Sequence, residues 1–192
     1  MPAATVASRR RSLDGRSAVH RTPRRGSAGG WRHRLPNRPH PSGSGTSGDS
    51  SGEEAPQILV VDDEPAIRTI CRVNLEASGI PVSEAADGAE ALERIRTEQP
   101  ALVLLDLMMP RVDGWEVAER LAADPETRDI PVVFLSARAS REDLEQAYRA
   151  GAVGYVVKPF DPLSLSTTIA SVLDRLERGE RQQLRDEIVK EP

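Results

Sequence analysis

The feature that most limits the fold is an alternation of two residue patterns that begins at Gln57. Short apolar runs rich in β-branched residues are typical of strands covered on both faces, and stretches with apolar residues at helical spacing follow them. Strands are expected over 58–61, 80–85, 102–105, 132–135 and 153–157, and helices over about 67–78, 87–97, 112–123, 141–150 and 162–177. This alternation predicts an α/β fold, a doubly wound five-stranded parallel sheet with helices on both faces.

Composition divides the chain of 192 residues into unequal parts. Residues 1–52 contain ten Arg, no Lys and two acidic residues, and they are rich in Gly, Ser and Pro. The apolar residues of this segment are too few to close a hydrophobic core. We therefore expect a disordered basic tail over 1–55, one folded domain over 56–178 and a polar C-terminal extension over 179–192.

The tail has several possible meanings. Its Arg clusters could neutralise phosphates of nucleic acid or anionic lipid, or they could screen the acidic domain. Translation could instead start later, near Ile58. The richness in Arg and Ser also fits a transit peptide. The sequence leaves these alternatives open.

Residue usage excludes several classes of protein. The one cysteine, Cys71, rules out a disulfide framework and a cysteine-based zinc site. All three histidines lie in the tail, so the folded part can have neither a histidine-dependent nucleophile nor a histidine-ligated metal. No apolar run approaches the roughly 18 residues of a membrane span. The expected location is the cytoplasm.

Polar side chains stand where the predicted strands end. Asp62 and Asp63 follow the first strand, Asp106 the third, Ser136 the fourth and Lys158 the fifth. In a parallel sheet these ends share one edge, and ligands bind there near the point where strand order reverses. The sequence therefore predicts that three carboxylates, a hydroxyl and an ammonium group lie together.

This set of groups suits phosphoryl transfer. Neighbouring carboxylates repel one another unless a cation joins them, and their hard oxygens favour Mg²⁺. Asp106 follows an apolar strand and is the best candidate for a nucleophile that forms an aspartyl phosphate. Lys158 and the Ser136 hydroxyl are placed to stabilise charge on the phosphoryl oxygens.

Six features at these separations resemble the receiver domain of two-component response regulators, over about residues 57–178. They are Asp62-Asp63, Asp106, Met109-Pro110, Asp113-Gly114, Ser136-Ala137 and Lys158-Pro159. The resemblance implies a flavodoxin-like (βα)5 fold with strand order 2-1-3-4-5. It also implies a single-domain architecture similar to that of a chemotaxis regulator.

The resemblance implies a metal site and a phosphoacceptor. Asp106 would accept the phosphoryl group. Asp63, Asp106 and the Met108 carbonyl would bind Mg²⁺ directly, and Asp62 would act through water. Lys158 would bind a phosphoryl oxygen, with the Lys158–Pro159 bond in the cis form that is largely confined to X–Pro bonds.

The resemblance also implies a switch and partners. Ser136, where Thr is commoner, and Tyr155, turning inward from an outward position, would change the face formed by the fourth helix, fifth strand and fifth helix. The phosphoryl donor would be a phosphohistidine on a sensor histidine kinase or phosphotransfer protein. A downstream protein or a second copy would read the face, without a DNA-binding output domain, because the C-terminal residues are too few for one. Beyond self-catalysed phosphoryl transfer and hydrolysis, no enzymatic activity is expected.

Two other functions remain as alternatives. A haloacid-dehalogenase-like phosphatase also uses an aspartyl nucleophile, but the acid that this family has two residues later is Met108 here. A pseudo-receiver would bind partners without phosphorylation, although the complete acidic set argues against it.

The site residues have simpler structural readings too. Asp62 or Asp63 could cap the following helix, and Ser136 could cap its own loop. Lys158 could be a solvated strand end, and Tyr155 could serve packing alone.

Overall fold

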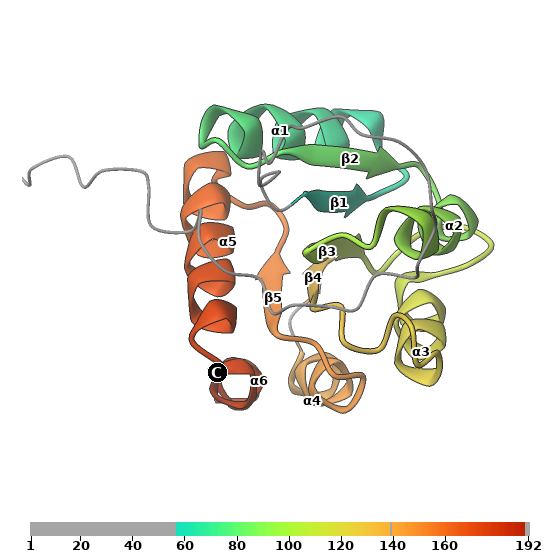
Figure 1. Cartoon of the computed structure of the whole chain (residues 1–192), viewed down its shortest axis with the longest axis vertical. Coiled ribbons are helices and arrows are strands. Elements are labelled where there is room, and N and C mark those ends of the chain that lie inside the picture. Colours follow the sequence, from blue (N-terminus) through green and yellow to red (C-terminus); the bar gives the residue numbers. More distant parts are fainter. Residues whose placement is uncertain (1–56, 139, 191–192) are drawn as a thin grey trace, which may run out of the picture. The chain divides into compact units, whose positions relative to one another are not determined.

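The computed structural model describes residues 57–138 and 140–190. The basic tail expected over 1–55 lies outside these residues. Strands and helices alternate along the described chain up to residue 177, and one more helix follows (Figure 1). The elements are β1 (Ile58–Val61), α1 (Pro65–Ala77), β2 (Val82–Ala85), α2 (Gly88–Glu98), β3 (Leu102–Asp106), α3 (Gly114–Ala123), β4 (Val132–Ser136), α4 (Arg141–Arg149), β5 (Gly154–Val157), α5 (Pro162–Glu177) and α6 (Arg181–Ile188).

The strands form one parallel sheet in the order β2-β1-β3-β4-β5. Helices α1 and α5 pack against each other over one face, while α2 and α3 pack together over the other. The predicted fold class and strand order are therefore confirmed. Strand order reverses at β1 and β3, so their carboxyl ends form the crevice where such sheets bind ligands.

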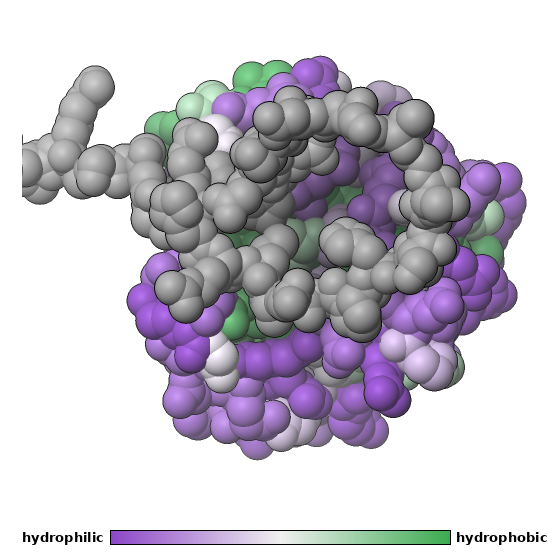
Figure 2. Space-filling view, in the orientation of Figure 1, coloured by the Kyte–Doolittle hydropathy of each residue, from purple (hydrophilic) through white to green (hydrophobic). Residues whose placement is uncertain are grey.

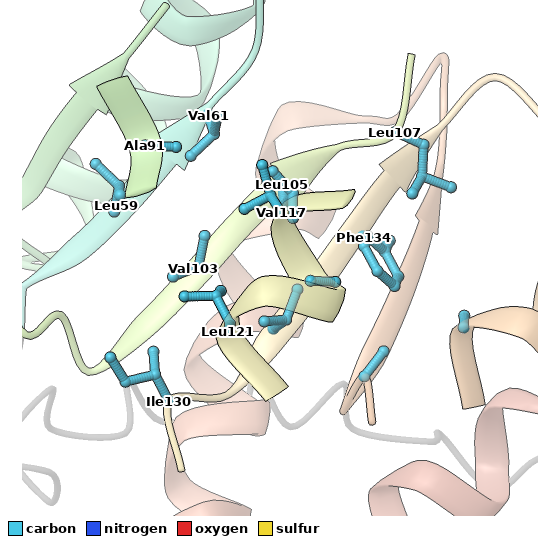
Figure 3. Close-up of a cluster of buried hydrophobic side chains, with 14 of the residues drawn as sticks. Leu59, Val61, Ala91, Val103, Leu105, Leu107, Val117, Leu121, Ile130 and Phe134 are labelled. Carbon is cyan, nitrogen blue, oxygen red and sulfur yellow. The ribbon is translucent and has the colours of Figure 1, made fainter. Parts of the chain in front are cut away.

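The continuous apolar runs are explained by two hydrophobic clusters, one on each face of the sheet. Leu59 and Leu105 point into the cluster that contains Phe134 (Figure 3), where the Trp115 ring lies 4.8 Å from the Phe134 ring between centroids. Alternate residues of the same strands, such as Val60 and Leu104, belong to the opposite cluster. The sheet is thus anchored on both sides, which holds the strand ends in fixed positions.

Side chains at the helix starts define where several helices begin. Asp87, Asp113 and Asp161 each accept a hydrogen bond from a backbone N–H in the first turn of α2, α3 and α5. Ser140 and Asp143 form a reciprocal capping box at α4. None of the described helices is both long enough and apolar enough to cross a membrane.

The C-terminal segment contains a helix that the sequence analysis did not predict. Within the polar extension expected over 179–192, residues 181–188 form α6. Leu184 and Ile188 lie one helical turn apart and are both buried. These two apolar residues give an otherwise polar segment a face that packs on the domain.

The thiol of Cys71 should be inert in the folded protein. Cys71 lies in the interior on α1, and burial raises the pKa of its thiol to about 12. Because the thiolate is the reactive form, we expect no reaction with a disulfide reagent at neutral pH until the protein unfolds. The absorbance of the coloured thiolate that such a reagent releases measures the extent of the reaction. Fast stoichiometric labelling of the native chain would contradict the assigned packing.

Candidate functional site

The carboxyl edge of the sheet gathers the side chains expected there. Asp62 and Asp63 follow β1, Asp106 and Ser136 are the last residues of β3 and β4, and Lys158 follows β5. One oxygen from each of the three carboxylates lies within 4.8 Å of the others. The sheet brings together these groups from segments almost 100 residues apart in sequence.

Backbone hydrogen bonds extend the sheet past the strand ends. The N–H of Leu107 donates to the Leu135 carbonyl at 3.0 Å, and that of Lys158 donates to the Ser136 carbonyl at 2.7 Å. The backbone positions of Asp106, Ser136 and Lys158 are therefore set by the same ladder that forms the core.

Lys158 pairs with two buried acids. Its Nζ donates to Asp62 Oδ2 at 2.6 Å and to Asp106 Oδ1 at 2.8 Å, and the side chain is 15% exposed. Burial alone would lower the pKa of Lys158, but the bonds to Asp106 and Asp62 outweigh it and raise the pKa. Lys158 is therefore not a solvated strand end. The Lys158–Pro159 bond is cis.

The acids differ in exposure. Asp62 is fully buried and Asp106 is 3% exposed, whereas Asp63 faces solvent. Burial raises the pKa of Asp62, and the hydrogen bond from Lys158 opposes that rise. Three carboxylates facing one ammonium leave excess negative charge and only oxygen donors. This donor set fits a hard divalent cation such as Mg²⁺.

Backbone N–H groups orient the two buried carboxylates. Asp62 Oδ1 accepts from the N–H of Glu64 at 2.9 Å, and Asp106 Oδ2 accepts from the N–H of Met108 at 3.0 Å. Glu64, not Asp62 or Asp63, is the N-cap residue of α1, and its side chain makes no capping bond. The local structure therefore directs the acids at the site rather than at the helix start.

Ser136 and Tyr155 meet at the loop after β4. Ser136 Oγ accepts from the N–H of Arg138 at 3.0 Å, which is the loop contact considered as its alternative role. The Tyr155 hydroxyl donates to the Arg138 carbonyl at 2.5 Å. Burial raises the pKa of Tyr155, and a hydrogen bond with Ser136 offsets part of the rise. The Tyr155 hydroxyl is thus tied to the backbone of this loop, and the side chain is half-buried.

Gly114 supports the site in a way that sequence reasoning missed, since it used Asp113-Gly114 only as one feature of the resemblance and gave it no role at the site. A Cβ at Gly114 would lie 2.2 Å from the Asp106 carbonyl oxygen and 2.8 Å from Leu107 Cα. Only glycine lets α3 begin so close to the end of β3. The Asp-Gly pair immediately before an amphipathic stretch was the available signal.

Replacing Gly114 with alanine should therefore destabilise the domain and disturb Asp106. Forcing a methyl group against the rigid backbone should lower the free energy of unfolding by about 1–3 kcal/mol. Urea denaturation measures the loss. Glu119→Ala, on the exposed side of the same helix, is the matched control and should be close to neutral. Equal stability of the two variants would disprove the close approach.

Several curated proteins are similar to this chain over its folded part. It is 41% identical over 123 residues to the DNA-binding dual master transcriptional regulator RpaA of Synechocystis sp., covering 64% of this chain and 51% of that protein. It is 40% identical over 121 residues to the alkaline phosphatase synthesis transcriptional regulatory protein PhoP of Bacillus subtilis, covering 63% and 50%. The chain thus spans about half the length of the curated relatives it matches.

These relatives overturn the expectation about partners. A single-domain regulator without a DNA-binding output domain was expected, acting on a downstream protein or a second copy. That expectation is wrong, because the relatives are named transcriptional regulators and one is described as DNA-binding. Each has about as much chain again beyond the matched segment. The small number of residues after α5 was not a valid reason to exclude such an output.

Solved structures and a family model also match the folded part of this chain. A CheY-like response regulator receiver domain protein from Methanospirillum hungatei matches with a TM-score of 0.61 and 31% identity, covering 66% of this chain and 99% of that one. The chemotaxis protein CheY4 of Vibrio cholerae matches with a TM-score of 0.59 and 30% identity, covering 62% and 98%. The model of the response regulator receiver domain matches residues 58–170. The chain therefore belongs to the response regulator receiver domain family.

Proposed function

We propose that Asp106 accepts a phosphoryl group from a phosphohistidine on a partner kinase. The observation that carries this proposal is the environment of Asp106. Its carboxylate is buried at a strand end, Lys158 Nζ lies 2.8 Å away, and Asp62 bonds to the same ammonium. A carboxylate so placed is ordered and desolvated before any phosphoryl group arrives.

The transfer exchanges one bond to phosphorus for another. An oxygen of the Asp106 carboxylate attacks phosphorus, the P–N bond of the phosphohistidine breaks, and the imidazole leaves with the electron pair and takes up a proton. Lys158 is close enough to move its ammonium from the carboxylates to a phosphoryl oxygen. The N–H of Met108 keeps the second Asp106 oxygen in place during the attack.

Asp62, Asp63, Asp106 and the Met108 carbonyl are the groups that would hold Mg²⁺. When bound, the ion supplies positive charge to the phosphoryl oxygens and offsets carboxylate repulsion. The exposure of Asp63 and Met108, the latter 60% exposed, leaves that side open to solvent and to a phosphoryl donor.

Ser136 and Tyr155 would carry the change to the face formed by α4, β5 and α5, here called the α4–β5–α5 face. The Ser136 hydroxyl would turn from its present partners toward a phosphoryl oxygen. Because the Tyr155 hydroxyl bonds to Arg138, whose N–H donates to the Ser136 hydroxyl, that movement alters the contacts of Tyr155. The face changes shape by a shift between two states that both exist beforehand, and a protein contact reads it.

Incubation with acetyl phosphate and Mg²⁺ separates this function from its alternatives. A stable single adduct on the chain supports the receiver function. Continuous release of phosphate from phosphoesters would instead indicate a phosphatase, and no reaction would indicate a pseudo-receiver. Intact mass and a phosphate-release assay on the same sample give all three readouts.

The phosphorylated chain should lose its phosphoryl group slowly. Hydrolysis needs a positioned water, and Met108 and Arg138 flank the approach to Asp106 and Ser136. The Met108 thioether cannot orient a water by a strong hydrogen bond. Met108→Asn should therefore speed the decay of the adduct by roughly 10-fold, because the amide can orient the attacking water by a hydrogen bond. An unchanged decay rate would reject this reasoning.

A further inference from the structure

The α4–β5–α5 face is covered by another part of this same chain. Helix α6 contacts α4, β5 and α5. It follows α5 after a turn at Arg178–Glu180 and lies beside α4 (Figure 1). The surface that the proposed switch would alter is therefore already occupied.

Two apolar side chains of α6 hold it against this face. Leu184 is 5% exposed and belongs to the hydrophobic cluster on the α5 side of the sheet. Ile188 is 6% exposed and belongs to the cluster on the α4 side. With both turned inward, the outer surface over α4 and α6 is mainly hydrophilic (Figure 2). Helix α6 therefore has a single apolar face, and that face is buried against the rest of the domain.

Charged contacts specify how α6 lies. Arg175 of α5 donates to both carboxylate oxygens of Glu187, at 2.6 and 2.8 Å. Arg185 donates to the Tyr148 carbonyl at 2.9 Å, near the C-terminus of α4, and its guanidinium lies 5.0 Å from the centre of the Tyr148 ring. A cation is favoured at a helix C-terminus, and the paired N–H groups of an arginine fix the orientation of a carboxylate.

The docking is nevertheless incomplete. A cavity remains between β5, α5 and α6, and Tyr155, Val172, Leu184 and Ile188 are among its walls. The buried Nε of Arg185 has no hydrogen-bond partner among the described residues. A helix of eight residues is also too short to persist in water by itself. Helix α6 is therefore held by a few side chains over an imperfectly filled space.

We propose that the α4–β5–α5 face is a helix-binding groove whose occupant is α6, and that another protein reaches this face only after α6 has left it. Tyr155 lines the same cavity as Leu184 and Ile188, so the switch residue and the occupant share one space. The importance of the face for signalling rests on the proposed function, whereas the docking of α6 does not.

The test uses the full chain with its own α6 released. Leu184→Ser together with Ile188→Ser removes both apolar anchors, and Gln183→Ser, on the exposed side of α6, is the matched control. In the double variant, amide exchange in α6 should become fast while β1 and β3 stay protected. A labelled peptide of the natural sequence 179–192 should then bind the double variant about 100-fold more tightly than the parent, whose own α6 competes at high effective concentration. Fluorescence anisotropy measures this.

A charge swap tests whether the peptide uses the same groove. A peptide carrying Glu187→Arg should fail to bind the double variant, because it brings a cation to Arg175. Adding Arg175→Glu to the protein should restore part of its binding, because the peptide's Glu180, which also pairs with Arg175 in the parent, then faces an acid. Rescue of this kind requires the pairing seen between α5 and α6, which unspecific adhesion would not reproduce.

Three results would overturn the proposal. They are loss of protection in β1 and β3 together with α6, equal peptide binding by parent and double variant, and absence of rescue by Arg175→Glu. Labelling by acetyl phosphate is measured on the same samples. If Asp106 fails to take up phosphate while the peptide results hold, the proposed function fails and the groove stands. If Asp106 takes up phosphate but the peptide results fail, only the proposal of a helix-binding groove is rejected.

Discussion

Replacing Lys158 with methionine should lower the free energy of unfolding by about 3–5 kcal/mol in the absence of divalent cations. The Lys158 ammonium is the shared partner of Asp62 and Asp106, both almost completely buried. Without it, two carboxylates face each other in the interior with no cation, and one of them must take up a proton for the chain to fold. Methionine keeps most of the side-chain volume, so lost packing contributes little.

The same variant should regain part of its stability when Mg²⁺ is added, because a cation that binds only the folded site favours it by mass action. Urea denaturation in EDTA and in Mg²⁺ measures both effects. Lys190→Met, an exposed lysine on the last turn before the end of the described chain, is the control and should be neutral in both buffers. If Lys158→Met matched the parent in EDTA, the central position assigned to the ammonium would be wrong.

The fold could be predicted because its elements are locally consistent. Each strand that is buried on both faces reads as an uninterrupted apolar run, as in β3, and each helix except α6 has a long amphipathic pattern. Among the strands, the expected bounds differ most at β2, an edge strand that starts at Val82 instead of residue 80 and is only partly buried. An edge strand has less apolar pattern to define its ends. The starts of α1 and α3 also differ from expectation, each by two residues. Strand order came from the resemblance rather than from the pattern.

The location of the site could be predicted from the strand ends, but several of the contacts that shape it could not. Polar residues directly after buried strands must lie at one edge, which located Asp62, Asp106 and Lys158. The close approach of Gly114 to the Asp106 backbone and the bond from Tyr155 to Arg138 depend on distances between segments, which no local pattern contains.

Helix α6 was missed for a related reason. Its sequence is mostly polar, and only Leu184 and Ile188 indicate a buried face. The contacts that hold it come from α4, β5 and α5, so its stability is tertiary rather than intrinsic.

Replacing Asp106 with asparagine should abolish phosphorylation while preserving the fold. The amide keeps the shape of the carboxylate but lacks the nucleophilic oxygen anion. It also removes one of three neighbouring negative charges, so the variant should be at least as well folded in EDTA as the parent. Asp63→Asn is the informative comparison: Asp63 is exposed and lies at the same edge, so its loss should slow labelling through the metal site without removing the acceptor.

The intact mass of the chain after incubation with acetyl phosphate tests the central claim most directly. In Mg²⁺, the parent should gain the mass of one HPO₃ group, the gain should disappear in EDTA, and peptide mapping should locate it at Asp106. The Asp106→Asn chain should gain nothing under any of these conditions. Equal labelling of the Asn variant, or a modified peptide that does not contain Asp106, would contradict the assignment of Asp106 as the phosphoacceptor.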